Sequence, residues 1–273
     1  MADLSYIRIP GDTRRKPQRP IFDPAHSVNR GVVLRTAPFL MGGSDIINLV
    51  NGKRIGFSGG TPTWAREKGE AAVDFSGSGS GDYIDTGIKV LAGWSFGVWY
   101  TMDAITTFDA HGTWSNLGTG ARSYVGFFDS GGGLDVAGFG SWTSSNAGAL
   151  DTNKVYAHIM SSDATNAYWW QEGKLIDSGA HTFDNAEAKT FFIGGRNSTA
   201  VGGLDNEFDG RILQVIIWNR YVPPTEAALL TKGSFYAGLV APRWLPIQQA
   251  AVAGGLSIPI AMHHYTKNLR ALS

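Results

Sequence analysis

A chain of 273 residues is long enough to bury a large core, and a single all-β domain can use most of that length. Its 23 Lys and Arg residues balance its 23 Asp and Glu residues, and this formal net charge of zero argues against nucleic acid as the main partner. The absence of cysteine excludes disulfide bonds, thiol catalysis and cysteine-ligated zinc.

The first 30 residues differ in composition from the rest. Four prolines interrupt them, and Arg14, Arg15 and Arg19 belong to a short basic run. Prolines oppose a helix or a central strand, so the segment is either a disordered tail or an arm that a partner orders. The amino terminus also lacks the apolar run of a secretory signal peptide, and we therefore expect the protein to fold in a cytoplasm.

Period-two alternation dominates the next part of the chain and predicts β-strands. In 94–100, Trp94, Phe96, Val98 and Tyr100 fall on one face and Trp99 falls on the other. The candidate strands are 32–34, 46–50, 71–75, 82–86 and 94–100. An Asn-Gly pair at 51–52 and a Ser-Gly repeat at 76–81 predict turns.

The second half continues the pattern, with further candidate strands at 124–128 and 134–139. In 211–218, Ile212, Gln214, Ile216 and Trp218 alternate with Leu213, Val215 and Ile217, so both faces are mostly apolar. Such a strand is expected between two layers. A short helix follows, which Thr225 is expected to cap and Gly233 to end.

The order of these motifs resembles the concanavalin A-like, laminin-G-like jelly-roll domains, and in particular those of tailed-bacteriophage virion proteins. The resemblance covers about 45–236 and is carried by these motifs: LVNG at 49–52, GGTPTW at 59–64, GEAAVDF at 69–75, GDYIDTG at 81–87, WSFGVW at 94–99, KVYAH at 154–158, YWWQEGKLI at 168–176, FFIGGR at 191–196, FDGRILQVIIWNR at 208–220 and PPTEAALL at 223–230.

The alternation and the resemblance together predict an all-β fold, an antiparallel β-sandwich at 31–236 with extended arms at 1–30 and 237–273. The residues expected on its inner faces are Phe75, Ile84, Phe96, Val98, Phe192, Ile193, Val215 and Ile217.

The carboxyl-terminal segment 237–273 is apolar but is broken by prolines, so it does not predict a membrane span. We expect it to lie along a subunit or partner interface. The predicted interface residues are Arg14, Arg15, Arg19, Trp244, Leu245 and Ile247. A homo-oligomer, a trimer or a dimer, is expected for the same reason.

No catalytic constellation is evident, and the sequence predicts that the protein is not an enzyme. Glycoside hydrolases place two carboxylates close together, whereas Asp82 and Asp85 lie three apart and would face opposite sides of a strand. His111, His158 and His181 lack metal-ligand spacing, and His158 is expected as a hydrogen-bonded core or edge residue.

Two kinds of ligand remain open. The resemblance implies that calcium could bind, and Asp205, Glu207 and Asp209 are spaced like ligands of a loop site, although ordinary solvated turn residues would look the same. A glycan would need an exposed aromatic ring, for which Trp114, Trp142 and Trp169 or its neighbour Trp170 are candidates. Adjacent tryptophans on a strand face opposite ways, so one of that pair is expected at a surface or an interface. Core packing is the alternative.

Two functions follow from these expectations. The resemblance favours a structural virion protein, a head decoration or tail-associated subunit assembled in the host cytoplasm and docked on other virion proteins through its arms. The alternative is a carbohydrate-binding, receptor-binding module whose partner is a cell-surface glycan.

Overall fold

The computed structural model describes residues 21–22, 26–36, 43–68, 70–77, 79–103, 110–118, 121–128, 134–147, 151–152, 154–186, 188–198, 203–205, 207–232 and 239–240. Within these ranges the side chains of 110–122, 124–138, 145–147 and 203–205 and of residues 21, 196, 198, 239 and 240 are not described. The chain separates into two units, one at Ile21–Leu239 and the other made of Met1–Pro20 and Val240–Ser273. Arg14, Arg15, Arg19, Trp244, Leu245 and Ile247 lie outside the described residues, so their interface role stays a prediction.

The first of two sheets has the strand order β12–β11–β10–β9–β16–β7, with β17 and β18 beside β9. Its strands are β7 (Ile84–Lys89), β9 (Ala110–Gly118), β10 (Ala121–Phe128), β11 (Leu134–Phe139), β12 (Trp142–Ala147), β16 (Thr190–Ile193), β17 (Arg196–Ser198) and β18 (Gly203–Asp205).

The second sheet has the order β15–β14–β13–β8–β19–β6–β5, with β2 paired to β19. Its strands are β2 (Val32–Arg35), β5 (Thr63–Glu67), β6 (Glu70–Ser76), β8 (Ser95–Met102), β13 (Tyr156–Ser162), β14 (Asn166–Gln171), β15 (Lys174–Ala180) and β19 (Asp209–Trp218). The remaining elements are β1 (Ile21–Phe22), paired with β20 (Leu239–Val240); β3 (Asp45–Ile47), paired with β4 (Arg54–Gly56); the 3-10 helix η2 (Ser27–Asn29); and the helix α1 (Pro224–Lys232).

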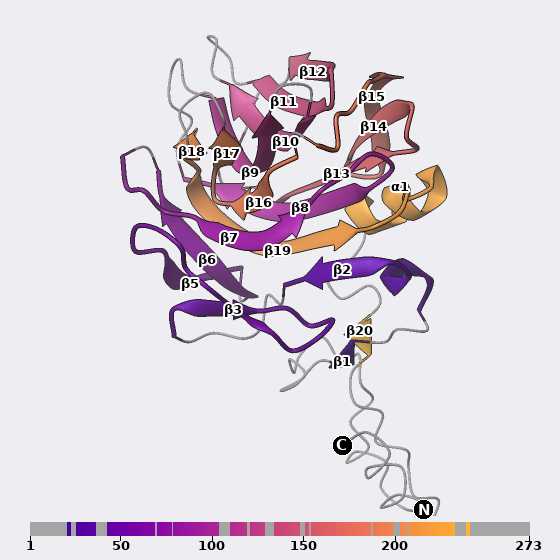
Figure 1. The fold of residues 1–273 in the computed structure, drawn as a ribbon. Coiled ribbons are helices and arrows are strands. Elements are labelled where there is room, and N and C mark those ends of the chain that lie inside the picture. Colours follow the sequence, from indigo (N-terminus) through magenta and orange to yellow (C-terminus); the bar gives the residue numbers. More distant parts are fainter. Residues whose placement is uncertain are drawn as a thin grey trace, which may run out of the picture. The chain divides into compact units, whose positions relative to one another are not determined.

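The two sheets stack face to face as an antiparallel sandwich, which confirms the predicted fold class (Figure 1). Among the registered strand pairs, only β17 with β9 is parallel. The Ser-Gly turn crosses between the layers, because β6 before it belongs to the second sheet and β7 after it to the first. Gly77, Gly79 and Gly81 all take positive φ there, which suits a glycine-rich crossing.

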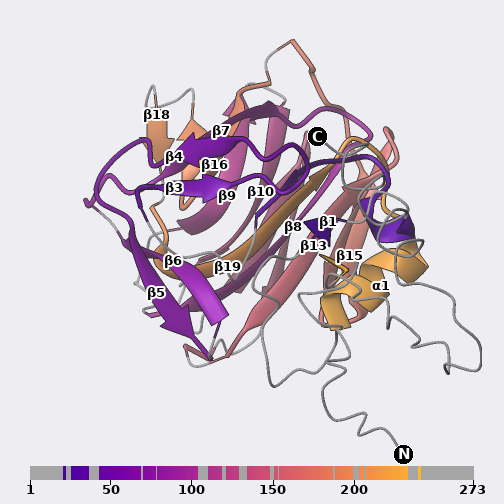
Figure 2. The same ribbon diagram turned by 90° about the horizontal axis from the view of Figure 1, so that it is seen from below.

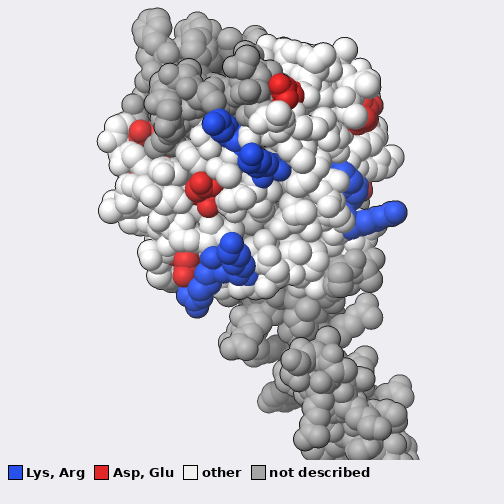
Figure 3. Space-filling view, in the orientation of Figure 1, with Lys and Arg blue, Asp and Glu red and all other residues white. Residues whose placement is uncertain are grey.

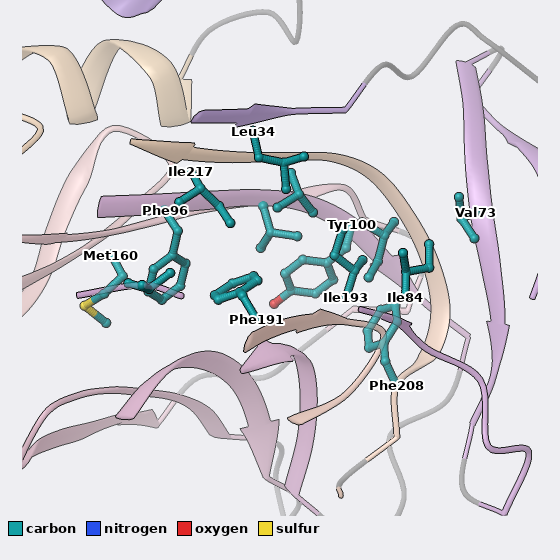
Figure 4. Packing of buried hydrophobic residues seen from close by; sticks show 14 of the residues in the cluster. Leu34, Val73, Ile84, Phe96, Tyr100, Met160, Phe191, Ile193, Phe208 and Ile217 are labelled. Carbon is teal, nitrogen blue, oxygen red and sulfur yellow. The ribbon is translucent and has the colours of Figure 1, made fainter. Parts of the chain in front are cut away.

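An inner cluster of buried side chains fills the space between the sheets. Phe96, Val98 and Tyr100 of β8 belong to it, as the alternation predicted, and Figure 4 shows Phe96 and Tyr100 near Phe191 of the first sheet. Trp99 points the other way, as predicted, into an outer cluster that packs the second sheet against α1 and η2. Figure 2 shows α1 beside β13 and β15 on that outer side. The middle strands β8 and β13 of the second sheet are therefore buried on both faces.

Three details differ from the sequence predictions. A bulge in β19 lies between Ile212 and Gln214, so Ile212 joins Val215 and Ile217 in the inner cluster instead of alternating with them. Phe191, and not Phe192, faces the inner cluster. The last difference concerns the helix, which begins at Pro224, so its cap is not Thr225.

Charged side chains are sparse on the face drawn in Figure 3, and the described Lys and Arg there are interspersed with Asp and Glu. Among the described residues, no helix has both the length and the hydropathy to span a membrane.

Candidate functional site

The two carboxylates weighed for hydrolysis both accept hydrogen bonds within the fold. Asp82 is buried and accepts from the Thr61 amide at 2.6 Å and the Ser76 amide at 3.0 Å. Asp85 is partly exposed and accepts from the Gly87 amide and the Thr190 hydroxyl. Both side chains therefore have structural partners, one holding loops together and the other joining β7 to β16.

Of the three predicted calcium ligands, the structure describes the side chains of Glu207 and Asp209. Glu207 Oε2 accepts from the Ser80 hydroxyl at 3.3 Å and from the Gly81 amide at 3.1 Å, so this carboxylate holds the Ser-Gly turn. Asp209 begins β19, and the side chain of Asp205 is not described. Within the described part of the chain, no three His, Asp or Glu residues are grouped to hold a metal ion. Calcium binding stays a prediction.

His158 lies in a polar network inside the inner core, as the sequence predicted for a hydrogen-bonded core residue. Its side chain is fully buried; Trp169 Nε1 donates to Nδ1 at 2.9 Å, and Nε2 lies 3.2 Å from the Tyr100 hydroxyl. An indole nitrogen can only donate, so Nδ1 must accept and the imidazole is neutral with its proton on Nε2. Burial, with a smaller contribution from Lys154, lowers the pKa of His158 to about 3.

This pKa predicts an acid-dependent stability. In the unfolded chain His158 becomes protonated below its ordinary pKa of 6.5. In the folded chain it stays neutral down to about pH 3. The free energy of unfolding should thus fall by up to about 1.4 kcal/mol per pH unit across this window and be independent of His158 above it. Urea unfolding of the full chain from pH 7 to pH 4 measures the slope, and His158→Gln should flatten it. An unchanged slope in that variant would contradict the assignment.

His181 lacks the geometry of a catalytic histidine. His181 is buried, its Nε2 lies 2.7 Å from the Ser162 hydroxyl, and burial lowers its pKa. A serine beside a histidine is the start of a nucleophilic pair, but Ser162 is fully buried and Nδ1 of His181 has no hydrogen-bond partner to orient it. The side chain of His111 is not described.

Neither of the adjacent candidates Trp169 and Trp170 is an exposed platform for a glycan. Trp169 was a wrong choice, because it is fully buried in the inner cluster against His158. Trp170 is not at a surface either, since it is buried beneath α1 in the outer cluster, which agrees with the alternative of core packing. Trp142 is partly exposed but packs on Gly179 of β15. The side chain of Trp114 is not described.

A pair of tyrosines that the sequence analysis missed lies at the surface instead. Tyr168 of β14 and Tyr221, between β19 and α1, are both partly exposed, and their ring centroids are 5.6 Å apart at 50°. The Tyr168 hydroxyl donates to Asp163 Oδ2 at 3.0 Å. We call Asp163, Tyr168 and Tyr221 the tyrosine site.

The tyrosine site is held in place by the surrounding backbone. Asp163 Oδ1 accepts from the amide and hydroxyl of Thr165 and from the Asn166 amide, which fixes the turn between β13 and β14. Within that turn Ala164 has φ of 86°, a conformation unusual for a residue with a Cβ. On the other side, Arg220 donates to the Tyr221 carbonyl and pairs with Glu226.

The carboxylate of the tyrosine site stays ionised. Partial burial would raise the pKa of Asp163, but the hydrogen bonds from Asn166, Thr165 and Tyr168 outweigh it and lower the pKa to about 2. The same contact raises the pKa of the Tyr168 hydroxyl, which therefore remains a donor. The site thus combines two aromatic rings with a fixed negative charge.

An internal space between the sheets is too small for a sugar. A cavity of about 20 Å³ lies among mostly apolar side chains of both sheets, including Ile84, Ile193 and Val215. That volume is close to the space of one water molecule.

Comparison with known proteins identifies the fold. No family model matches the chain, and no curated protein matches it in sequence. Domain 4 of AbnA, a GH43 extracellular arabinanase from Geobacillus stearothermophilus solved with arabinotriose, matches with a TM-score of 0.53 and 16% identity over 73% of this chain and 98% of that domain.

Two larger proteins contain the same fold as a part. The Trypanosoma rangeli sialidase in complex with sialic acid matches with a TM-score of 0.53 and 16% identity, over 74% of this chain and 32% of the sialidase. The binding domain of botulinum neurotoxin DC in complex with SialylT matches with a TM-score of 0.53 and 13% identity, over 75% of this chain and 52% of that domain. At these identities the likeness shows the fold alone, and that fold is the concanavalin A-like jelly roll of lectin-type domains.

Proposed function

We propose that the protein is a carbohydrate-binding module and that the tyrosine site is its glycan-binding surface. The observation that carries the proposal is the partly exposed Tyr168–Tyr221 ring pair with Asp163 hydrogen-bonded at its edge. Aromatic faces pack against the C–H faces of sugar rings, while a carboxylate accepts hydrogen bonds from sugar hydroxyls.

The fold gives independent support. Two of the compared structures are described with a bound saccharide, arabinotriose in one and sialic acid in the other. We propose binding without cleavage, because Asp82 and Asp85 are already occupied by hydrogen bonds within the fold. A sugar-binding module needs only an accessible surface, and the tyrosine site provides one.

Removing one ring tests this function. Tyr168→Ala in the full chain should weaken binding to whichever glycan the wild type selects on a glycan array by at least about tenfold, because it removes both the stacking face and the hydroxyl held by Asp163. Isothermal titration with that glycan measures the change. Tyr83→Ala is the matched control, since Tyr83 is also partly exposed and stacked on a neighbouring ring, Phe192, at 4.5 Å.

The control variant should bind as the wild type does. Equal binding by Tyr168→Ala and wild type would mean that the glycan binds at another surface. A full chain that binds no glycan would contradict the proposed function.

A structural role in a bacteriophage virion, with the terminal arms docked on other virion proteins, is a second proposal that rests on the order of sequence motifs. Residues 1–20 and 241–273, which make up most of the two arms, lie outside the described residues. Mass spectrometry of purified virions would test it directly. The two proposals are compatible, because a receptor-binding module can be carried on a virion.

A further inference from the structure

We propose that the tyrosine site selects neutral glycans, which donate their hydroxyl groups to Asp163 and Tyr168, and that it rejects acidic glycans. This inference rests on the proposed function and deepens it, because a sugar-binding surface could in principle take either class. Three properties of the site support it: the free hydrogen-bonding capacity of Asp163 and Tyr168, the charge of Asp163, and the hydrogen bonds that Arg220 already makes.

The free hydrogen-bonding capacity of Asp163 and Tyr168 is that of acceptors. Asp163 Oδ1 already accepts three hydrogen bonds, from the Thr165 amide and hydroxyl and from the Asn166 amide. Oδ2 accepts one, from Tyr168, and Asp163 is exposed. A carboxylate oxygen has about two lone-pair sites, so Oδ2 can accept one more hydrogen bond from solvent or a ligand. The Tyr168 hydroxyl donates its only proton to Asp163, so toward a ligand it can only accept a hydrogen bond. A ligand group that hydrogen-bonds to Asp163 Oδ2 or to the Tyr168 hydroxyl must therefore be a donor.

Hydroxyl groups of a neutral sugar satisfy that requirement, and a carboxylate does not. The charge of Asp163 is fixed, since its hydrogen bonds keep the pKa at about 2. A ligand carboxylate would bring a second negative charge to an acceptor that has no proton to share. Like charges in contact disfavour binding, and desolvating both makes the contact worse.

Arg220 does not compensate for this charge. Arg220 adjoins Tyr221 in the chain, but its guanidinium donates to the carbonyls of Arg30, Tyr221 and Ser27 and to the Glu226 carboxylate. Turning toward a ligand would break bonds that hold the backbone under Tyr221. Bidentate recognition of an acidic sugar by arginine would thus cost the site its own support.

Paired glycans that differ only by a terminal sialic acid test the inference with the full chain. We expect the neutral member of a pair to bind at least about tenfold more tightly than its sialylated partner. Asp163→Asn should weaken binding of the neutral glycan by about tenfold, because a hydrogen bond to a charged acceptor is lost. It should also reduce the ratio of the affinity for the neutral glycan to the affinity for the sialylated one. Tyr168→Phe keeps the ring and removes the second acceptor, so it should weaken neutral binding less than Tyr168→Ala.

Asp184→Asn is the matched control. Asp184 is exposed in a loop and accepts one backbone hydrogen bond, from Ala186, but is not part of the tyrosine site. Its substitution should leave both affinities unchanged, and thermal melting should show every variant folded. Tighter binding of sialylated glycans, or neutral binding indifferent to Asp163→Asn, would overturn this inference and leave the proposed function standing. Failure of the full chain to bind any glycan overturns both.

Discussion

Replacing His158 with alanine is expected to lower the free energy of unfolding by about 4 kcal/mol. Two losses add up at this position. The side chain is fully buried in the inner cluster, so its removal leaves a cavity between the sheets. Trp169 Nε1 then loses its acceptor in a place that is wholly screened from solvent, and an unpaired buried donor keeps its full desolvation cost.

Urea unfolding at pH 7, followed by tryptophan fluorescence, measures this loss. His26→Ala provides the control, because His26 is exposed and its ring accepts only the Val28 amide at the start of η2. That variant should lose about 1 kcal/mol or less, the usual cost of a lost cap. Similar losses in the two variants would mean that the buried network contributes little and that water reaches Trp169.

The strands whose alternation is uninterrupted could be predicted from sequence. In β8 the inner and outer residues are those expected, because a strand paired on both sides without a bulge keeps its period of two. In β19 the period breaks after Ile212, where the extra residue of a bulge turns the following side chains over. Such a bulge depends on the register with β8 and leaves no mark in the sequence of β19 itself.

The candidate site shows the same limit at the level of tertiary packing. Alternation along β14 correctly implies that Tyr168 and Trp169 face opposite sides, yet it cannot tell which side is covered. α1 covers Trp170 and leaves Tyr168 partly open, which follows from where the helix packs. The approach of Tyr221 depends on β8 lying between β13 and β19, an order that no local pattern contains.

His158 is the opposite case. A histidine inside a strand of apolar residues has few ways to be satisfied, so a buried hydrogen bond could be predicted from the sequence alone. Its partners could not, since Tyr100 and Trp169 come from the strands on either side of β13. Residue type thus indicated the environment, while the strand order determined the contacts.

Replacing Gly210 with alanine is expected to cost about 4 kcal/mol or more, for a reason that neither propensity nor burial alone supplies. Gly210 has φ of 144°, a region that residues with a Cβ rarely enter. It also pairs with Phe75 of β6 and Met102 of β8, so its backbone is held from both sides. An added Cβ would lie 2.2 Å from the carbonyl oxygen of Thr101 and 2.9 Å from the Cα of Met102.

Both obstructing atoms belong to the backbone of β8, which cannot move without disturbing the middle of the second sheet. Gly52→Ala separates this crowding from backbone strain, because Gly52 also has positive φ, 71°, but an added Cβ would meet no atom within 4 Å. Strain alone should therefore cost that variant about 1 kcal/mol. Paired urea titrations of the two variants give the difference, which we assign to the Thr101 and Met102 contacts. If Gly210→Ala lost no more stability than Gly52→Ala, the centre of the second sheet would have to be far more deformable than its two-sided pairing and burial imply.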